Sequence, residues 1–282
     1  MTRRPILPMP SDRLAVALVT DVFPHRGDSA RLHHRLRTAR ELGARLAVLP
    51  ELPLNAWAPL TRQPSHADAE DPCGPRHRAL AEAARATGVA VLGGAIVRDA
   101  DTGRPHNTAL LLDREGGLLL RYRKVHLPDE EGYWEAHHYE PGDRLHAPAR
   151  LAGWGIGVQI CSDVNRPQGC NALAAMGAET ILAPRATPPE TYPRWRMVLR
   201  ANAVTSCAYV ISVNRPGARS GGVIGGPSIA IGPSGDVLVE TADPVAVVTL
   251  ERAALDAARE EYPGYLDVRP DVYEDAWRRA RR

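Results

Sequence analysis

The chain has 282 residues, of which 44% are hydrophobic and 24% charged, and its formal net charge is +2 at pH 7. This composition is typical of a globular protein with a large core, and apart from the terminal RRARR it contains no basic block that would suit a phosphate backbone. No apolar run approaches the roughly 18 residues of a membrane span, and the N-terminus lacks an apolar signal segment, so we expect a cytoplasmic protein that binds neither nucleic acid nor membrane.

The first half of the chain shows a strand–helix–strand opening, then a second helix, a strand and an antiparallel hairpin. Apolar runs rich in β-branched residues indicate the strands, and apolar residues at helical spacing indicate the helices. The predicted strands span 13–20, 46–50, 89–97, 107–114 and 118–124, and the predicted helices span 31–44 and 75–88.

The second half repeats this alternation and adds a hairpin around the turn GPSG. The predicted strands span 155–160, 180–184, 209–214, 228–232, 236–240 and 245–250, and the predicted helices span about 167–177 and 191–207. Helices that alternate with strands and hairpins predict one α/β domain over 1–282, with two mixed β-sheets stacked face to face and helices on the outer faces. We expect residues from about 260 to 282 to form an extended tail that packs on a partner subunit.

Three titratable residues follow predicted strands, where reactive groups of α/β sheets tend to lie. Glu51 follows 46–50, Cys161 follows 155–160, and Lys124 closes 118–124 as the single lysine among 35 basic residues. Taken alone, each has an ordinary explanation as a helix cap, a core thiol or a surface ammonium. Together they suggest a thiol whose pKa is depressed by an ammonium and a helix N-terminus, beside a carboxylate that can accept its proton.

The motifs around these residues resemble the nitrilase, or carbon–nitrogen hydrolase, superfamily. The segments LPEL, YRKVHLP and GVQICSD carry the glutamate, lysine and cysteine in the family's order, and the resemblance covers about four fifths of the chain, with further matches at 132–143, 194–203, 212–217 and 225–238. The sequence is most similar to the N-carbamoylputrescine amidase branch. The resemblance implies an αββα sandwich, pairing into homodimers or larger homo-oligomers, and no metal or organic cofactor.

The resemblance also implies a role for each residue. Glu51 would act as general base and Cys161 as nucleophile, while Lys124 and the backbone N–H of Ser162 would stabilise the oxyanion. Glu135 falls on the family's second glutamate. The implied reaction is hydrolysis of a non-peptide C–N bond in a small linear amide or N-carbamoyl amine, with release of ammonia; nitrile hydrolysis and a catalytically idle scaffold remain alternatives.

The substrate pocket is less well defined by the motifs. Ser162 is small and should open space beside the reacting carbonyl, and we expect Trp57 and Tyr133 to line the pocket. Arg185 would favour a substrate carboxylate. Glu130 and Glu131 would instead favour an amine, and the sequence leaves both possibilities open. A further departure from the family pattern is that Gln168 and Asn171 replace its usual Glu and Arg.

Other features suggest no additional chemistry. His137 and His138 are adjacent and lack a third ligand at suitable spacing, so no metal site is expected. The glycine pairs lack the strand–GxGxxG–helix context of a nucleotide site. The four cysteines, Cys73, Cys161, Cys170 and Cys207, show no CxxC spacing, and we expect them to be reduced.

Overall fold

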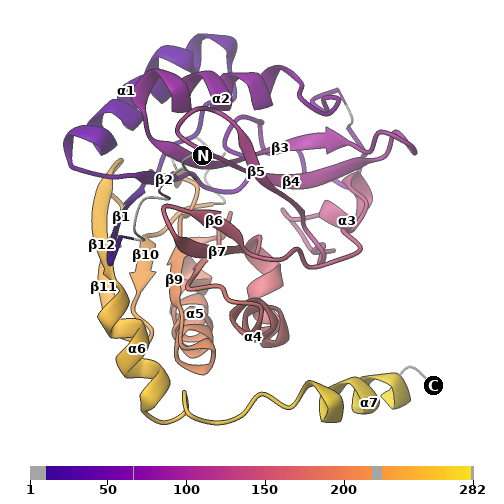
Figure 1. The fold of residues 1–282 in the computed structure, drawn as a ribbon. Coiled ribbons are helices and arrows are strands. Elements are labelled where there is room, and N and C mark those ends of the chain that lie inside the picture. The colour runs from indigo at the N-terminus through magenta and orange to yellow at the C-terminus, as the bar shows by residue number, and fades with distance from the viewer. Residues whose placement is uncertain (1–10, 66, 218–223, 281–282) are drawn as a thin grey trace, which may run out of the picture.

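The computed structural model describes residues 11–65, 67–217 and 224–280, which form two six-stranded β-sheets stacked face to face (Figure 1). The first sheet has the order β12 (Ala246–Glu251), β1 (Arg13–Leu18), β2 (Leu46–Val48), β3 (Ala90–Arg98), β4 (Pro105–Leu112) and β5 (Leu118–Arg123). The second has the order β11 (Val237–Thr241), β10 (Ser228–Ile231), β9 (Tyr209–Ser212), β8 (Thr180–Leu182), β7 (Trp154–Val158) and β6 (Ala149–Leu151).

Both sheets are mixed, as predicted. Strands β1, β2 and β3 are parallel in the first sheet, and β7, β8 and β9 are parallel in the second. Antiparallel neighbours flank each parallel centre. The carboxyl ends of the parallel strands therefore meet at one edge of each sheet, which brings together the loops that follow them.

Helices cover the outer faces of the sandwich, so its predicted architecture is confirmed (Figure 1). The helices α1 (Ser29–Glu41) and α2 (Pro75–Thr87) pack on the first sheet, and α4 (Pro167–Ala175) and α5 (Tyr192–Ser206) pack on the second. Proline at the first position suits the start of α2 because its missing N–H has no acceptor there, and Gly88 ends that helix at a φ of 66°. Short helical segments lie in the loops: η1 (Arg26–Asp28), α3 (Glu135–His138), η2 (Cys161–Asn165) and η3 (Pro189–Thr191).

Strand β1 illustrates how the sequence builds this layering. Leu14, Val16 and Leu18 belong to the apolar cluster between the two sheets. Ala17 belongs to the cluster between the first sheet and its helices. Since successive side chains of a strand point to opposite faces, a strand buried on both faces needs an almost continuous apolar run.

The C-terminal segment differs from its predicted extended form. After α6 (Arg252–Glu260), the chain runs away from the sandwich and forms α7 (Pro270–Ala280) (Figure 1). The ion pairs Arg278–Glu274 and Arg279–Asp275 join residues one turn apart and favour a helix. The extended prediction is therefore wrong for α7. No helix within the described residues is both long and apolar enough to cross a membrane.

Candidate active site

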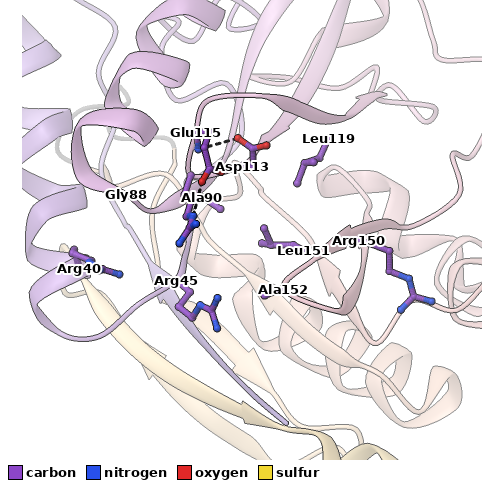
Figure 2. Close-up of a pocket in the computed structure, with 11 residues that line it drawn as sticks. Arg40, Arg45, Gly88, Ala90, Asp113, Glu115, Leu119, Arg150, Leu151 and Ala152 are labelled. Carbon is purple, nitrogen blue, oxygen red and sulfur yellow. Dashed lines mark hydrogen bonds and ion pairs between the residues drawn. The ribbon is translucent and has the colours of Figure 1, made fainter. Parts of the chain in front are cut away.

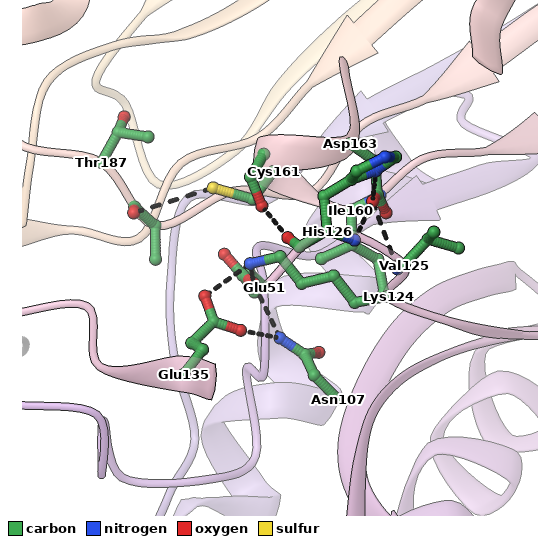
Figure 3. Close-up of polar contacts among 12 residues, drawn as sticks. Glu51, Asn107, Lys124, Val125, His126, Glu135, Ile160, Cys161, Asp163 and Thr187 are labelled. Carbon is green, nitrogen blue, oxygen red and sulfur yellow. Dashed lines mark hydrogen bonds and ion pairs between the residues drawn. The ribbon is translucent and has the colours of Figure 1, made fainter. Parts of the chain in front are cut away.

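The three residues singled out by their positions after strands lie together at one end of the sandwich (Figure 3). Glu51 follows β2, Lys124 follows β5, and Cys161 is the first residue of η2, after β7. The first two come from one sheet and the third from the other. All three are buried, with relative exposures of 1%, 0% and 5% respectively.

Lys124 is the centre of a buried ionic cluster. Its Nζ donates to Glu51 Oε1 at 2.7 Å and to Glu135 Oε1 at 2.5 Å. Asn107, in β4, donates through Nδ2 to the same oxygen of Glu51 at 2.8 Å and to Glu135 Oε2 at 3.0 Å. An ammonium has three N–H bonds, and this cluster uses two of them.

The cluster shifts the pKa values of its members in ways that their neighbours explain. Burial opposes the charge of Lys124, but the adjacent carboxylates of Glu135 and Glu51 outweigh it and raise the lysine pKa well above its ordinary value. Burial raises the pKa of Glu135 to about 7, with Lys124 opposing this shift and Glu51 adding to it. The lysine therefore stays charged, while Glu135 takes up a proton near neutral pH.

Glu51 keeps one carboxylate oxygen available. Its Oε2 is buried and has no hydrogen-bond partner among the described residues. The loop that carries Glu51 is held from the other sheet by Arg215, whose guanidinium donates to the carbonyls of Glu51 at 2.9 Å and Leu52 at 2.6 Å. A buried carboxylate oxygen without a donor is poised to accept a proton from a substrate or nucleophile.

Cys161 occupies a tight turn between β7 and η2. Its φ of 47° is in the left-handed region, which costs free energy for a residue with a side chain. Its backbone N–H donates to Pro184 O at 2.9 Å, and its thiol lies 3.9 Å from Ala186 O. The turn directs the thiol into the space beside the ionic cluster (Figure 3).

The predicted direction of the thiol pKa shift is wrong. Burial raises the pKa of Cys161 well above its ordinary value, and the charges of Glu51 and Glu135 add to this effect, while Lys124 opposes it. The sequence reveals the ammonium, but it does not show that two carboxylates already neutralise it. The resting thiol is therefore protonated.

Two of the predicted pocket residues pack against each other near the thiol. Trp57 and Tyr133 are buried, with ring centroids 5.9 Å apart in an edge-on arrangement, and Trp57 Nε1 donates to Gly132 O at 3.0 Å. Burial raises the pKa of Tyr133, and the charges of Cys161 and Glu51 raise it further, which places this ring next to the cluster. Direct contact of these rings with a substrate stays a prediction.

Ser162 follows the nucleophile and links two loops. Its Oγ donates to His126 O at 2.5 Å, so the side chain is held against the loop after Lys124. Its backbone N–H has no acceptor among the described residues. This N–H is therefore free to serve as the predicted oxyanion donor.

Arg185 is buried beneath the site, and protein oxygens already engage its guanidinium. It donates to Ser212 Oγ at 3.0 Å, to Thr187 Oγ1 at 2.5 Å and to the carbonyl of Pro227. Its relative exposure is 1%. Recognition of a substrate carboxylate by this residue stays a prediction, and the geometry favours a role in joining the loops around it.

Two residues of the site were not identified from the sequence. Asn107 begins the predicted strand 107–114, and with His106 and Thr108 it forms a polar cluster at a strand end, which is a signal of buried polar contacts. Arg215 lies in the matched segment 212–217 but received no role. The adjacent histidines do not act together: His137 Nε2 pairs with Asp129 at 3.0 Å, whereas His138 Nε2 lies 2.7 Å from Thr61 O.

A second cavity, of about 300 Å³, shares no lining residue with the ionic cluster; Figure 2 shows its lining. Arg40, Arg45 and Arg150 line it together with the turn at 113–115. Helices α1 and α2 end beside it, since Arg40 lies in the last turn of α1 and Gly88 follows the last residue of α2. Because cations stabilise helix C-termini, the basic side chains here have a structural explanation.

Comparison with known proteins agrees with this geometry. The family model of carbon–nitrogen hydrolases matches residues 18–260. An (R)-stereoselective amidase from Pseudomonas sp is 34% identical over 194 residues, which cover 67% of this chain and 68% of that protein. The N-carbamoylputrescine amidase of Solanum lycopersicum is 29% identical over 187 residues, which cover 60% of this chain and 62% of that protein.

The fold has a close counterpart among solved structures. The crystal structure of a carbon–nitrogen hydrolase from Helicobacter pylori matches with a TM-score of 0.79 and 19% sequence identity, covering 94% of this chain and 98% of that one. The match supports the two-sheet sandwich, and the family model supports the sequence motifs. The chain therefore belongs to the carbon–nitrogen hydrolase family.

Proposed function

We propose that the protein is a cysteine-dependent hydrolase that cleaves a small linear amide or N-carbamoyl amine and releases ammonia through a thioester or S-carbamoyl enzyme. The observation that carries this proposal is the unpartnered Oε2 of Glu51, buried beside a charged Lys124 and the Cys161 thiol. In this proposal Glu51 takes a proton, Lys124 stabilises negative charge, and Cys161 attacks the carbonyl carbon.

The first half of the reaction couples proton transfer to attack. Because burial and the two carboxylates keep the Cys161 thiol protonated, Glu51 Oε2 takes its proton as sulfur bonds to the carbonyl carbon. The resulting oxyanion accepts the third N–H of Lys124 and the backbone N–H of Ser162. Losing one such donor typically costs about 3 to 4 kcal/mol of transition-state stabilisation.

The second half returns the site to its starting state. The C–N bond breaks and Glu51 gives its proton to the departing nitrogen, which leaves as ammonia. Glu51 then takes a proton from water, whose oxygen attacks the acyl carbon, and the sulfur leaves and regains its proton from Glu51. An amide yields an acid, and an N-carbamoyl amine yields a carbamic acid, which loses carbon dioxide to leave the amine. Glu135 holds Lys124 in place throughout.

The rim of the site favours a substrate with a positive group. Glu130 is exposed and forms an isolated bridge with Tyr133, the aromatic residue beside the cluster. Arg185, by contrast, is committed to protein oxygens. We therefore infer a preference for an N-carbamoyl amine over an N-carbamoyl acid, in line with the N-carbamoylputrescine amidase among its relatives.

The decisive experiment measures ammonia released from a panel of linear amides, ureido amines, ureido acids and nitriles. We expect turnover of amides and ureido amines, and loss of it in Cys161→Ala. Glu130→Gln should raise KM for ureido amines more than for neutral amides. Nitriles as the only substrates would replace the amidase proposal, and no turnover of any compound would favour a scaffold.

A labelling experiment tests the general base directly. Chloroacetamide should alkylate Cys161 in the wild type and react far more slowly with it in Glu51→Gln, because the buried thiol then has no acceptor for its proton. The exposed Cys73 provides the control within the same molecule, and its labelling should not change. Equal labelling of Cys161 in both proteins would remove Glu51 from this role.

We also propose that a second copy of the chain covers the C-terminal arm, residues 261–280, and that the enzyme works in the cytosol with its cysteines free. The arm exposes large apolar side chains, namely Tyr262, Tyr265, Leu266, Val268, Val272, Tyr273 and Trp277. Such a concentration of exposed apolar surface is typical of a protein interface. Light scattering should show a homodimer or larger homo-oligomer, which Tyr273→Glu with Trp277→Glu should dissociate. A monomer in both cases would contradict this assembly.

A further inference from the structure

The carboxylate of Asp163 is fully buried and reaches across to the loop that carries Lys124. Its Oδ1 accepts the backbone N–H of Val125 at 3.2 Å and of His126 at 2.8 Å, and it lies 2.9 Å from His126 Nδ1 (Figure 3). Val125 is the residue next to Lys124. One oxygen therefore holds the backbone immediately after the lysine.

The other oxygen of Asp163 holds groups on both sides of the site. Its Oδ2 accepts the hydroxyl of Tyr122 at 2.8 Å and the backbone N–H of Ile160 at 3.1 Å. Tyr122 precedes Lys124 by two residues, and Ile160 directly precedes Cys161. Burial raises the pKa of the Tyr122 hydroxyl and the charge of Asp163 raises it further, so this group stays a donor.

This arrangement spans the two sheets. The lysine loop continues from β5 in the first sheet, and the cysteine turn continues from β7 in the second. Packing between sheets is not directional, whereas a buried carboxylate that accepts four hydrogen bonds and also contacts a histidine ring nitrogen has a defined position. The left-handed φ of Cys161 also needs neighbours that maintain it. Asp163 supplies such a contact at the preceding residue.

We propose that Asp163 is a positioning residue that sets the placement of Lys124 relative to Cys161. The inference rests on the proposed function, in which the sulfur attacks a carbonyl carbon while the ammonium receives the oxyanion. Asp163 touches neither the reacting atoms nor the ammonium. It acts through the backbone N–H groups of Val125 and Ile160, the neighbours of these two residues, so its loss should affect steps that need the pair together.

Two reactions of the same thiol separate this role from a general loss of structure. In alkylation by chloroacetamide, the sulfur–carbon bond forms as the carbon–chlorine bond breaks, chloride leaves, and Glu51 takes the thiol proton. No oxyanion forms at the carbonyl in this step, so alkylation needs Cys161 and Glu51 but does not need Lys124 as an oxyanion donor. Amide hydrolysis needs all three.

Asp163→Asn is the principal variant. An amide offers one acceptor oxygen where the carboxylate has two, and its NH₂ would face the N–H of Ile160 or of Val125 and His126. We expect kcat for hydrolysis to fall about a hundredfold, as for a displacement of about 1 Å, with KM nearly unchanged. Alkylation of Cys161 should slow less than about threefold. The ratio of the two rates is the measured quantity.

The matched control is Glu70→Gln. Glu70 is also a buried carboxylate that accepts two backbone N–H groups, those of Arg76 at 2.8 Å and His77 at 3.0 Å, but it lies at the start of α2 and outside the ionic cluster. Its replacement should lower the melting temperature and leave the ratio of hydrolysis to alkylation as in the wild type. Equal ratios in both variants would overturn the proposal.

Tyr122→Phe keeps the test decisive if Asp163→Asn does not fold. It removes the hydroxyl that donates to Asp163 and retains the ring, so we expect hydrolysis to fall about fivefold relative to alkylation, the scale of one hydrogen bond. An unchanged ratio in a folded Tyr122→Phe protein would overturn the positioning role. Absence of hydrolysis in the wild type would instead refute the proposed function, so the two failures are distinguishable.

Discussion

Lys124 and Arg185 are both buried cations at the active-site end, and their environments differ. Lys124 lies between two carboxylates, which raise its pKa well above its ordinary value although burial opposes the charge. Arg185 donates to hydroxyl groups and a carbonyl and lies over the ring of Tyr192, and burial lowers its pKa to about 10. Burial opposes the positive charge of both side chains, and the neighbouring carboxylates decide whether the pKa rises or falls.

The difference explains why the chain uses one lysine. The space between two carboxylates and a substrate carbonyl suits a compact ammonium with three donors on one atom. The oxygens around Arg185 come from the end of β9 and from two loops, and they suit a planar guanidinium. We expect Lys124 to take part in the chemistry and Arg185 to be structural, and the following variants test this expectation.

Lys124→Arg should have the largest effect on activity. The guanidinium retains the charge, but it is too wide for a site in which Nζ lies 2.7 Å and 2.5 Å from two carboxylate oxygens, and it should miss the oxyanion. We expect kcat to fall at least about a hundredfold, equivalent to about 2.7 kcal/mol. Steady-state ammonia release would measure this loss. A thermal melt of the same preparation controls for unfolding, and near-native kcat would contradict the role of the ammonium.

Glu135→Gln should change the pH dependence of the reaction. Since the pKa of Glu135 is raised to about 7, its carboxylate gains a proton as the pH falls through neutrality. The cluster then loses one of the two negative charges that lie beside Lys124. We expect kcat/KM of the wild type to fall below about pH 7. In Glu135→Gln only Glu51 faces the lysine, so the acid limb should move to lower pH. A profile with the same acid limb in both proteins would assign the titration to another group.

Arg185→Ala should have the smallest effect on the chemistry and a clear effect on stability. It leaves buried oxygens without donors, which costs about 3 kcal/mol of unfolding free energy or more, as measured by chemical denaturation. If Arg185 is structural, KM for ureido acids and for neutral amides should change by the same factor. A selective rise in KM for the acidic substrates would instead show that Arg185 binds a carboxylate.

The exact geometry of the site depends on contacts that no local pattern encodes. Asn107 lies in a predicted hairpin strand, but its partners are 28 and 56 positions away in the sequence. Asp163 lies in the segment GVQICSD, and its partners are 3 to 41 positions away. The direction of the Cys161 pKa shift was predicted wrongly for the same reason. The shift depends first on the burial of the thiol and then on the charges of Glu51, Lys124 and Glu135, none of which is close to Cys161 in the sequence.

The sequence by itself determined the alternation of strands and helices, the two mixed sheets, and the three loops that carry Glu51, Lys124 and Cys161. These features follow from local periodicity, from turn residues and from motifs, all of which are read within short segments. Only the tertiary structure decided that β12 pairs with β1 and which protein groups engage Arg185. Strand pairing and the contacts of buried charges join residues that are distant in the chain. They therefore form only once the two sheets have come together.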